Sequence, residues 1–303
     1  MKLAHIRDVV AVARCGGLRQ AARQLGLTQP AMTRSIREVE RELGAPLFDR
    51  VAQGVIPTRI GEAFIRRAAW IEAELARARD EVAQLRGEGG GTVAIGLSTV
   101  PHLALLPRVL NQFRARFPDA VLTIEEGLFT RMQGSLEDGH LDFYVGPLTE
   151  ADPPPSLLVE TLFENHRIVF CRKGHPMRAA TSLAELTDAS WITTSVTIQR
   201  DAELGPLFAR HGLPAPRIRM HAQSALTMVL SAAHSDLLTM LPQQWLAFPA
   251  IPALLDHIEV AELLPAPTMR IVRRKSLPLT PAAEFLADMV RRAATNLRVD
   301  ALR

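Results

Sequence analysis

The sequence contains little cysteine and few aromatic residues. Two of its 303 residues are cysteine, one is tyrosine, and aromatic residues make up 5% of the chain. Cys15 and Cys171 lie far apart and form no C-x-x-C pair, which excludes the disulfide framework of a small secreted domain. We expect both thiols to be core residues of different domains, so that they cannot form a redox-sensing pair.

The sequence also lacks a signal-peptide pattern and a long uninterrupted hydrophobic run. His5, Arg7 and Asp8 interrupt the apolar positions of the first thirteen residues. The longest uncharged stretch, Leu237 to Leu255, contains three prolines and therefore predicts a buried strand, turn and helix instead of a membrane span. We expect a cytoplasmic protein without a membrane partner.

The usual sequence signatures of catalytic sites are missing. The chain has no G-x-S-x-G, no P-loop, no G-x-G-x-x-G after a strand and no H-E-x-x-H. Its nine histidines show no metal-ligand spacing, so we expect no metal, no cofactor and no catalytic residue. An α/β-fold enzyme acting on a small anionic substrate is the alternative function. A solute-binding protein is disfavoured because a signal peptide is missing.

Positive charge is concentrated at the N-terminus, although the formal net charge of the whole chain is only +3. Residues 1–60 contain ten lysine and arginine residues against five acidic ones, whereas residues 88–303 contain twenty against twenty-two. This distribution indicates a polyanionic partner for the first segment alone.

The first sixty residues show the pattern of a helix-turn-helix followed by a hairpin. Apolar residues recur at helical spacing in two short segments before residue 26. Thr28 then precedes Gln29 and Pro30, which predicts a helix N-cap and a proline in the first turn. Two short strands, 47–50 and 55–58, surround a glycine-containing turn and predict a wing.

The helix that follows Thr28 has an apolar and a polar side. Its predicted buried stripe consists of Met32, Ile36, Val39 and Leu43. The polar side carries groups suited to base edges and phosphates. For this helix taken alone, a polar face that meets only water is the favoured explanation, but the wing that follows favours DNA binding. The residues expected to contact DNA are Leu18, Arg19, Thr28, Gln29, Pro30, Thr33, Arg34, Arg37, Arg50 and Thr58.

The run GGLRQAARQLGLTQPAMTRSIREVERELGAPLFDR, with the GVIPTRIGEAF that follows, resembles the DNA-binding head of LysR-type transcriptional regulators. The resemblance implies that Gln29, Pro30, Thr33 and Arg34 face the major groove and that Arg50 supports the wing. Thr33 stands where serine is usual in the family. The resemblance also implies a double-stranded DNA operator, a small-molecule effector, contact with RNA polymerase, and a homotetramer built as a dimer of dimers.

A long helix without proline is predicted between this head and the rest of the chain. Its apolar residues alternate in steps of four and three, which is typical of a two-stranded coiled-coil seam and predicts dimerisation. A helix packed on its own domain would show the same pattern over two heptads. The glycine-rich stretch 87–91 predicts a hinge after the helix. The seam consists of Phe64, Ala68, Ile71, Leu75, Ala78, Val82 and Leu85.

From Thr92 onward, short apolar strands alternate with helices, which predicts an α/β fold with a largely parallel sheet. We expect strands at 92–97, 121–126, 141–146, 167–172, 191–194, 217–221, 237–241 and 268–274, and helices at 103–116, 130–138 and from Pro281. Two lobes with two crossings resemble the periplasmic-binding-protein-like sensor domain of the same regulators, on the stretches RFPDAVLTIEEG, LEDGHLDFYVG and GHPM. The stretches FARHGLPAP, HSDLLTMLP and SLPLTPAA are similar to a toluenesulfonate-responsive branch of the family.

The ligand is expected where strands end and helices begin between the lobes. Ser98 and Thr99 follow the first strand and are predicted to cap a Val100–Arg116 helix, while Phe129 would cover an aromatic ring. For each hydroxyl residue taken alone, a helix cap without any ligand is the favoured explanation, and only their convergence in this fold supports a ligand site. The residues expected to bind a small anionic aromatic effector are Ser98, Thr99, Val100, Phe129, Thr130, Gly146, Pro147, Thr193, Thr194 and Ser195.

These observations predict a transcription regulator of three parts. The expected parts are a winged helix-turn-helix DNA-binding domain at 1–58, a dimerising linker helix and hinge at 59–90, and an effector-binding domain at 91–303, with lobe I at 91–161 and 268–303 and lobe II at 162–267.

Overall fold

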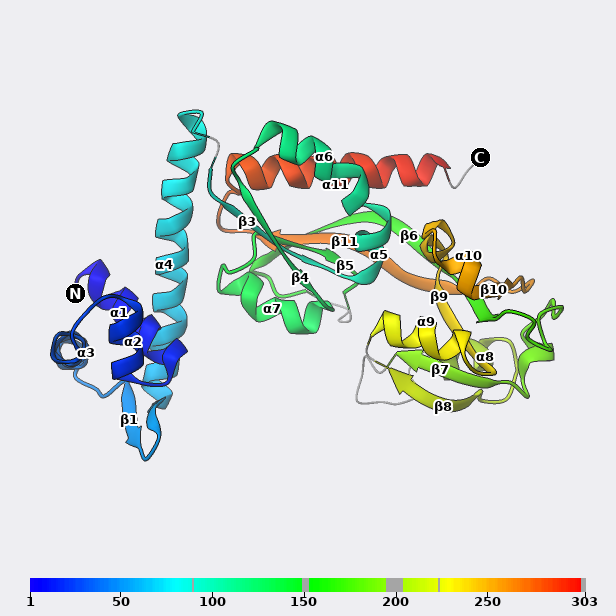
Figure 1. Cartoon of the computed structure of the whole chain (residues 1–303), viewed down its shortest axis with the longest axis horizontal. Helices are drawn as coiled ribbons and strands as arrows, with labels where there is room; N and C mark the ends of the chain where they lie inside the picture. Colours follow the sequence, from blue (N-terminus) through cyan, green and yellow to red (C-terminus); the bar gives the residue numbers. More distant parts are fainter. Residues whose placement is uncertain (89, 149–152, 195–203, 223, 301–303) are drawn as a thin grey trace.

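The chain forms a helical head, one long helix and a two-lobed α/β half (Figure 1). The computed structural model describes residues 1–88, 90–148, 153–194, 204–222 and 224–300. The head and the long helix contain α1 (Leu3–Cys15), α2 (Leu18–Gln24), α3 (Gln29–Leu43), β1 (Phe48–Val51), β2 (Gly54–Pro57) and α4 (Arg59–Leu85).

The first three helices enclose a small apolar core. Met32, Ile36 and Val39 on α3 are buried in it, as the helical spacing predicts. Leu43, the predicted last member of this stripe, is 39% exposed, because α3 ends there at Gly44. Cys171 is buried in the α/β half, whereas Cys15 is only half-buried in the head.

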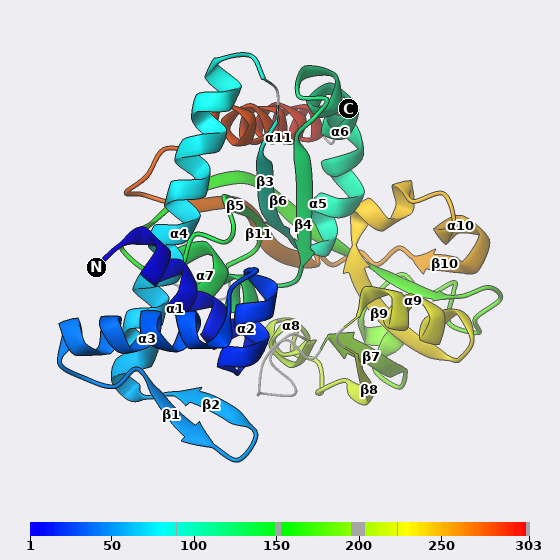
Figure 2. The same cartoon turned by 60° about the vertical axis from the view of Figure 1, so that its left-hand side comes forward.

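The wing hairpin, which projects from the head in Figure 2, is fastened to it by close backbone contacts. The Val55 amide donates to the Gly16 carbonyl over 2.9 Å, and a Cβ on Gly54 would collide with that carbonyl. The Thr58 amide donates to the Leu47 carbonyl over 2.9 Å, and buried Gly61 leaves no room for a Cβ beside the same oxygen. This packing explains why a glycine, Gly61, follows Thr58 by three residues.

Helix α4 packs its first half against the head, whereas its second half contacts lobe I and leaves two apolar side chains exposed. Ala68 and Ala69 are buried with Val10 of α1. At the far end, Val82 is 56% exposed and Leu85 is 72% exposed. Part of the predicted seam is therefore used within the chain, and the rest is available on the surface.

The α/β half begins after the long helix. Its elements are β3 (Thr92–Leu97), α5 (Thr99–Ala104), α6 (Leu106–Arg116), β4 (Val121–Glu126), α7 (Phe129–Glu137), β5 (Phe143–Gly146), β6 (Leu157–Arg172), η1 (Ala184–Leu186), β7 (Ser190–Thr194), α8 (Leu204–Arg210), β8 (Arg217–Ala222), α9 (Ala225–Ala233), β9 (Leu237–Pro242), η2 (Gln243–Ala247), α10 (Ile251–Leu254), β10 (Leu255–Ile258), β11 (Pro265–Arg274) and α11 (Pro281–Asp300).

The strands form one continuous sheet that passes through both lobes. Its order is β4-β3-β5-β11-β6-β9-β7-β8, with β10 paired to β6. The pairs β3–β4, β3–β5, β7–β8 and β7–β9 are parallel, as expected. The central strands β6 and β11 run antiparallel to their neighbours, so the sheet is mixed. These two long strands are the crossings between the lobes.

Two predicted elements differ in length from those observed. Strand β6 starts at Leu157, ten residues before the predicted strand, because its first part pairs with β11 and its second part with β9. The predicted helix at 103–116 is confirmed over α6, but its start differs, because the helical segment is divided at Leu105 into α5 and α6, with Pro107 in the first turn of α6.

Each lobe buries apolar side chains on both faces of its part of the sheet. In lobe I, α6 and α11 cover one face and α7 the other (Figure 1). In lobe II, α8 packs over the face that carries Trp191, and α9 packs over the face that carries Ile192. No helix within the described ranges is long and apolar enough to cross a membrane.

Candidate functional sites

The outer face of α3 presents polar side chains to solvent. Gln29, Pro30, Arg34 and Arg37 are exposed, and Thr33 is half-buried. The Thr33 hydroxyl donates to the Gln29 carbonyl over 3.0 Å. Toward a partner, Thr33 can therefore accept a hydrogen bond or make an apolar contact through its methyl group. These side chains form a polar surface of the kind that base edges and phosphates require.

The remaining predicted DNA-contact residues divide into exposed cations and structural groups. Arg19 and Arg50 are exposed, whereas Leu18 packs against the core of the head. The Thr28 hydroxyl accepts from the Ala31 amide over 3.3 Å and so caps α3. The Thr58 hydroxyl caps α4, since it accepts from the Gly61 amide over 2.9 Å and donates to the Pro46 carbonyl over 2.8 Å.

A buried carboxylate beneath α3 holds the helix against α1. Ser35 donates to Asp8 Oδ2 over 2.6 Å, and Arg7 donates to Asp8 Oδ1 over 2.9 Å. Asp8 is buried, and a carboxylate in such a place needs these donors to offset its desolvation. We did not anticipate this contact, because Asp8 and Ser35 are far apart in sequence and neither belongs to a motif.

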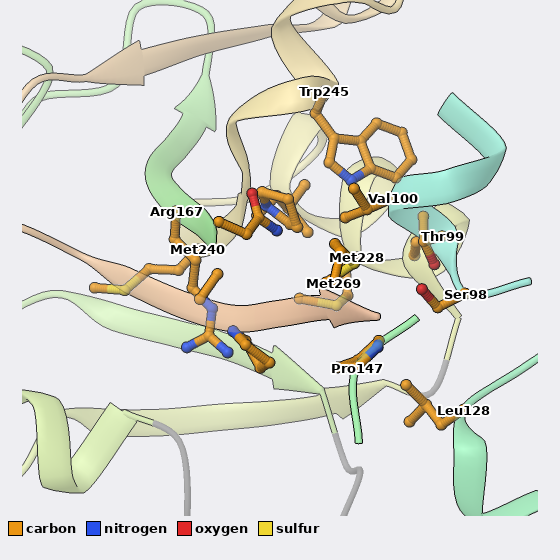
Figure 3. A pocket seen from close by; sticks show the side chains of 16 residues that line it. Ser98, Thr99, Val100, Leu128, Pro147, Arg167, Met228, Met240, Trp245 and Met269 are labelled. Carbon is orange, nitrogen blue, oxygen red and sulfur yellow. The ribbon is translucent and has the colours of Figure 1, made fainter. Parts of the chain in front are cut away.

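A cavity of about 140 Å³ lies between the two lobes (Figure 3). Ser98, Thr99, Val100, Leu128 and Pro147 come from the lobe I side. The crossing strands and lobe II provide Asn165, Arg167, Ala225, Met228, Met240, Leu241, Pro242, Trp245, Ala266, Pro267 and Met269. Apart from the single arginine and a few hydroxyl, amide and indole groups, this wall is apolar.

Four of the ten predicted effector residues belong to the wall of this cavity, namely Ser98, Thr99, Val100 and Pro147. Phe129 is 1% exposed and packs against Tyr144, with ring centroids 5.6 Å apart. Thr130 is exposed, and Gly146 and Thr193 are buried. None of these four lines the cavity, Thr194 is described only as the last residue of β7, and Ser195 lies outside the described residues.

The predicted capping of a long helix by Ser98 is also wrong. Helix α5 has six residues, and the Ser98 side chain makes no capping hydrogen bond. Ser98 Oγ instead lies close to the Tyr144 phenol, although the two do not meet in hydrogen-bond geometry. Burial raises the pKa of Tyr144 above its ordinary range, and its hydroxyl donates to the Pro147 carbonyl over 3.4 Å.

The polar groups of lobe II were missed by our sequence analysis. Asn165 and Arg167 lie on the part of β6 where the lobes meet, and Trp245 lies on η2. We expected this strand to begin at residue 167, so Asn165 lay outside it. The alternation that places the Asn165 and Arg167 side chains on the same face of β6 was therefore missed. Trp245 was not selected, although it closely follows the predicted strand at 237–241, because the strand-end rule was applied in lobe II only to the strand that ends at Thr194.

No group of three or more histidine, cysteine, aspartate or glutamate residues able to hold a metal ion occurs in the described part of the chain.

The head and the two-lobed half together are the parts of a ligand-responsive DNA-binding transcription regulator. Two family models match the chain, a bacterial regulatory helix-turn-helix protein of the lysR family at residues 3–62 and a LysR substrate binding domain at residues 86–295. The second match covers more than half of the sequence. The protein therefore belongs to the LysR family of DNA-binding transcription regulators, and its C-terminal half is an effector-binding domain.

Curated relatives extend over nearly the whole chain. The HTH-type transcriptional regulator TdcA of Escherichia coli (strain K12) is 26% identical over 290 residues, which cover 96% of this chain and 92% of TdcA. The SDS degradation transcriptional activation protein of a Pseudomonas species is 28% identical over 294 residues, 95% of each chain. Both are regulators of transcription, which confirms the prediction that the protein is not an enzyme.

Solved structures share the complete architecture. CbnR, a LysR family transcriptional regulator, superposes with a TM-score of 0.70 at 20% identity, over 97% of this chain and 99% of CbnR. ArgP from Mycobacterium tuberculosis superposes with a TM-score of 0.70 at 18% identity, over 96% of both chains. At such identities the likeness concerns the fold, and it confirms the predicted winged head and two-lobed sensor.

Proposed function

We propose that this LysR-family regulator responds to a small anionic aromatic effector, a sulfonate or a carboxylate, bound in the cavity between its lobes. The composition of the cavity wall carries the proposal. Arg167 is the one charged side chain among the described residues of the wall, which also contains methionine, leucine, proline and tryptophan side chains. A guanidinium group on an apolar wall suits a ligand with one anionic group and a hydrophobic body.

The size of the cavity supports a ligand with one ring. An apolar protein cavity of about 150 Å³ is known to hold benzene, and the present cavity measures about 140 Å³. The thioether groups of Met228, Met240 and Met269 are suited to the faces and edges of an aromatic ring. A benzene ring with a sulfonate or carboxylate group therefore matches the volume and the charge of the wall.

Two sequence relationships favour a sulfonate. Three stretches of the effector-binding half are similar to a toluenesulfonate-responsive branch of the family. The name of one relative, at 28% identity, refers to the degradation of SDS, which is an anionic sulfate ester. The sulfonate and sulfate groups share tetrahedral geometry and negative charge, both of which arginine recognises.

We propose that the head reads an operator through the exposed side chains of α3 and holds phosphates with Arg19 and Arg50. The exposure of Gln29, Arg34 and Arg37 on one helix face supports this assignment. CbnR, which shares the fold, has a solved structure in complex with its target DNA.

We propose that α4 pairs two chains and that two such dimers form a tetramer. The exposure of Val82 and Leu85 supports the pairing, because these side chains continue the predicted seam beyond the head. A groove of about 350 Å³ between α1 and α4, lined by Ile71 and Leu75 among others, extends this apolar surface.

A ligand screen with matched variants tests the effector proposal. Toluenesulfonate and benzoate should raise the melting temperature of the full chain, whereas neutral toluene should not, because only an anion pairs with Arg167. Arg167→Met should abolish the response to the anions. Arg219→Met, which removes an exposed arginine on β8 away from the cavity, should keep it. Equal responses in the two variants would contradict the proposal.

A further inference from the structure

Three buried polar atoms without a hydrogen-bond partner lie in the wall of the same cavity. They are Ser98 Oγ, Asn165 Nδ2 and Trp245 Nε1, and their residues are 5%, 3% and 7% exposed. Native proteins leave few buried polar groups unpaired, because each one costs stability. The gathering of three such atoms around one cavity therefore indicates that a ligand supplies their partners.

The three atoms belong to two separate regions of the wall. Asn165 and Arg167 are two residues apart on β6, so their side chains leave the strand on the same side. The Trp245 indole nitrogen and the Ser98 hydroxyl lie near Val100, whereas the Arg167 guanidinium lies on the opposite side of the cavity (Figure 3). Met228 and Met269 lie between the two regions in this view.

The chemistry of each region defines what it can bind. The indole N–H and the amide N–H of Asn165 only donate, since Asn165 Oδ1 already accepts from the His166 amide over 3.0 Å. Both regions therefore require an acceptor. Among the described residues of the wall, the cation lies in the Arg167 region and not in the Ser98 and Trp245 region, so the anionic group of a ligand is expected at Arg167.

We infer that the effector is a monoanion with a neutral hydrogen-bond acceptor at the end opposite its anionic group, where Trp245 Nε1 and Ser98 Oγ bind it. The anionic group lies at Arg167 and Asn165. This inference rests on the proposed effector cavity and specifies the ligand that it takes. A ring with a para hydroxyl, carbonyl or nitro group meets the description, and a ring with a para methyl group does not.

The matched probes are para-hydroxybenzenesulfonate and para-toluenesulfonate, which have similar volumes and differ by a hydroxyl against a methyl group. Calorimetry on the full-length protein should give at least about tenfold tighter binding of the hydroxyl compound, because its methyl analogue leaves buried donors unpaired. Trp245→Phe should remove most of this preference. Trp191→Phe should retain it, because Trp191 Nε1 is also buried and unpaired but lies outside the cavity wall. Ser98→Ala changes the side-chain volume less than Trp245→Phe does, and it should also reduce the preference for the hydroxyl compound.

The outcomes separate this inference from the proposed function. Equal binding of the two probes to the wild type would overturn the inference, while the proposed anion site would stand. A hydroxyl preference that survives in both Trp245→Phe and Ser98→Ala would also overturn it. Tighter binding of the dianion para-sulfobenzoate than of para-hydroxybenzenesulfonate would show that the second region prefers a charge. If neither matched probe binds the wild type, both the proposed function and the inference fail.

Discussion

Arg77 Nε donates to Asp142 Oδ1 over 2.9 Å and so fastens the linker helix α4 to lobe I across 65 residues of sequence. The second Asp142 oxygen accepts from the Ala94 amide of β3 over 2.8 Å. The same guanidinium pairs with Glu74 over 2.6 Å and donates to the Gly139 carbonyl. The helix that leaves the head is therefore held on the sensor by a largely buried ionic cluster.

Arg274 connects this cluster to the strand that borders the cavity. Its Nη2 donates to Glu74 over 2.9 Å, and Arg274 is the last residue of β11. Ala266, Pro267 and Met269, near the other end of β11, line the cavity. A single strand thus joins the cavity wall to the linker helix.

Removal of Arg77 should destabilise the protein strongly. Burial raises the pKa of Asp142 in spite of the neighbouring Arg77, so the carboxylate depends on that cation when it is ionised. Arg77→Met should cost about 3–5 kcal/mol of unfolding free energy, because it leaves a buried charge unpaired. Denaturant unfolding near pH 7 measures the loss. Arg79→Met, at an exposed position of the same helix, is the control, and equal stability of the two variants would refute the role of the pair.

Arg34 should contribute to operator affinity by reading a base. It is exposed on the first half of α3, and Arg34→Ala should cost about 1–3 kcal/mol if the guanidinium binds a guanine edge in bidentate fashion. Arg41→Ala removes an exposed arginine from the last turn of the same helix and should have a smaller effect. Fluorescence anisotropy with the operator compares the two, and an unchanged Arg34→Ala affinity would exclude a base contact.

Arg50 should act through phosphate instead of base recognition. It is exposed on β1 of the wing, opposite Val55 of β2. Arg50→Ala should weaken binding to specific and unrelated DNA alike, and it should reduce the slope of log affinity against log salt by about one. A variant that loses affinity only for the operator would show that Arg50 reads sequence.

The sequence predicts best the elements whose signals are local. The N-cap of α3 is formed by Thr28 itself and an amide three residues away, so its pattern is complete within one turn of helix. Strands β3 and β4 have the predicted bounds, 92–97 and 121–126, since each is a short parallel strand bounded by loops. Hydrophobic periodicity is sufficient to predict an element when the residues of that element alone define where it begins and ends.

The cavity could be predicted only in part, because its residues meet through tertiary structure. Ser98 was found from the rule that ligands bind at strand ends. Asn165 and Arg167 lie within a crossing strand, to which that rule does not apply, and Trp245 lies on the short 3₁₀ helix that follows β9. Phe129 was expected to cover the aromatic ring of a ligand, because it stands near the start of a helix. Its own ring instead packs against Tyr144 inside lobe I. The sequence alone does not show on which side of a helix the first residue packs.

The exposed apolar side chains of α4 should pair two chains in solution. Leu75 lines the groove between α1 and α4, and Val82 and Leu85 extend the apolar seam on the surface. Leu75→Asp would bury a carboxylate without a partner in the paired helices, so it should dissociate the pair. Ala63→Asp adds the same charge at an exposed position of the helix outside the seam and should leave the assembly intact. Light scattering at micromolar concentration gives the mass of each variant.

Because two half-sites one helical turn apart require two linked heads, Leu75→Asp should also lose most of its affinity for a two-site operator while binding a single half-site like the wild type. A wild-type mass equal to one chain would exclude pairing through this helix.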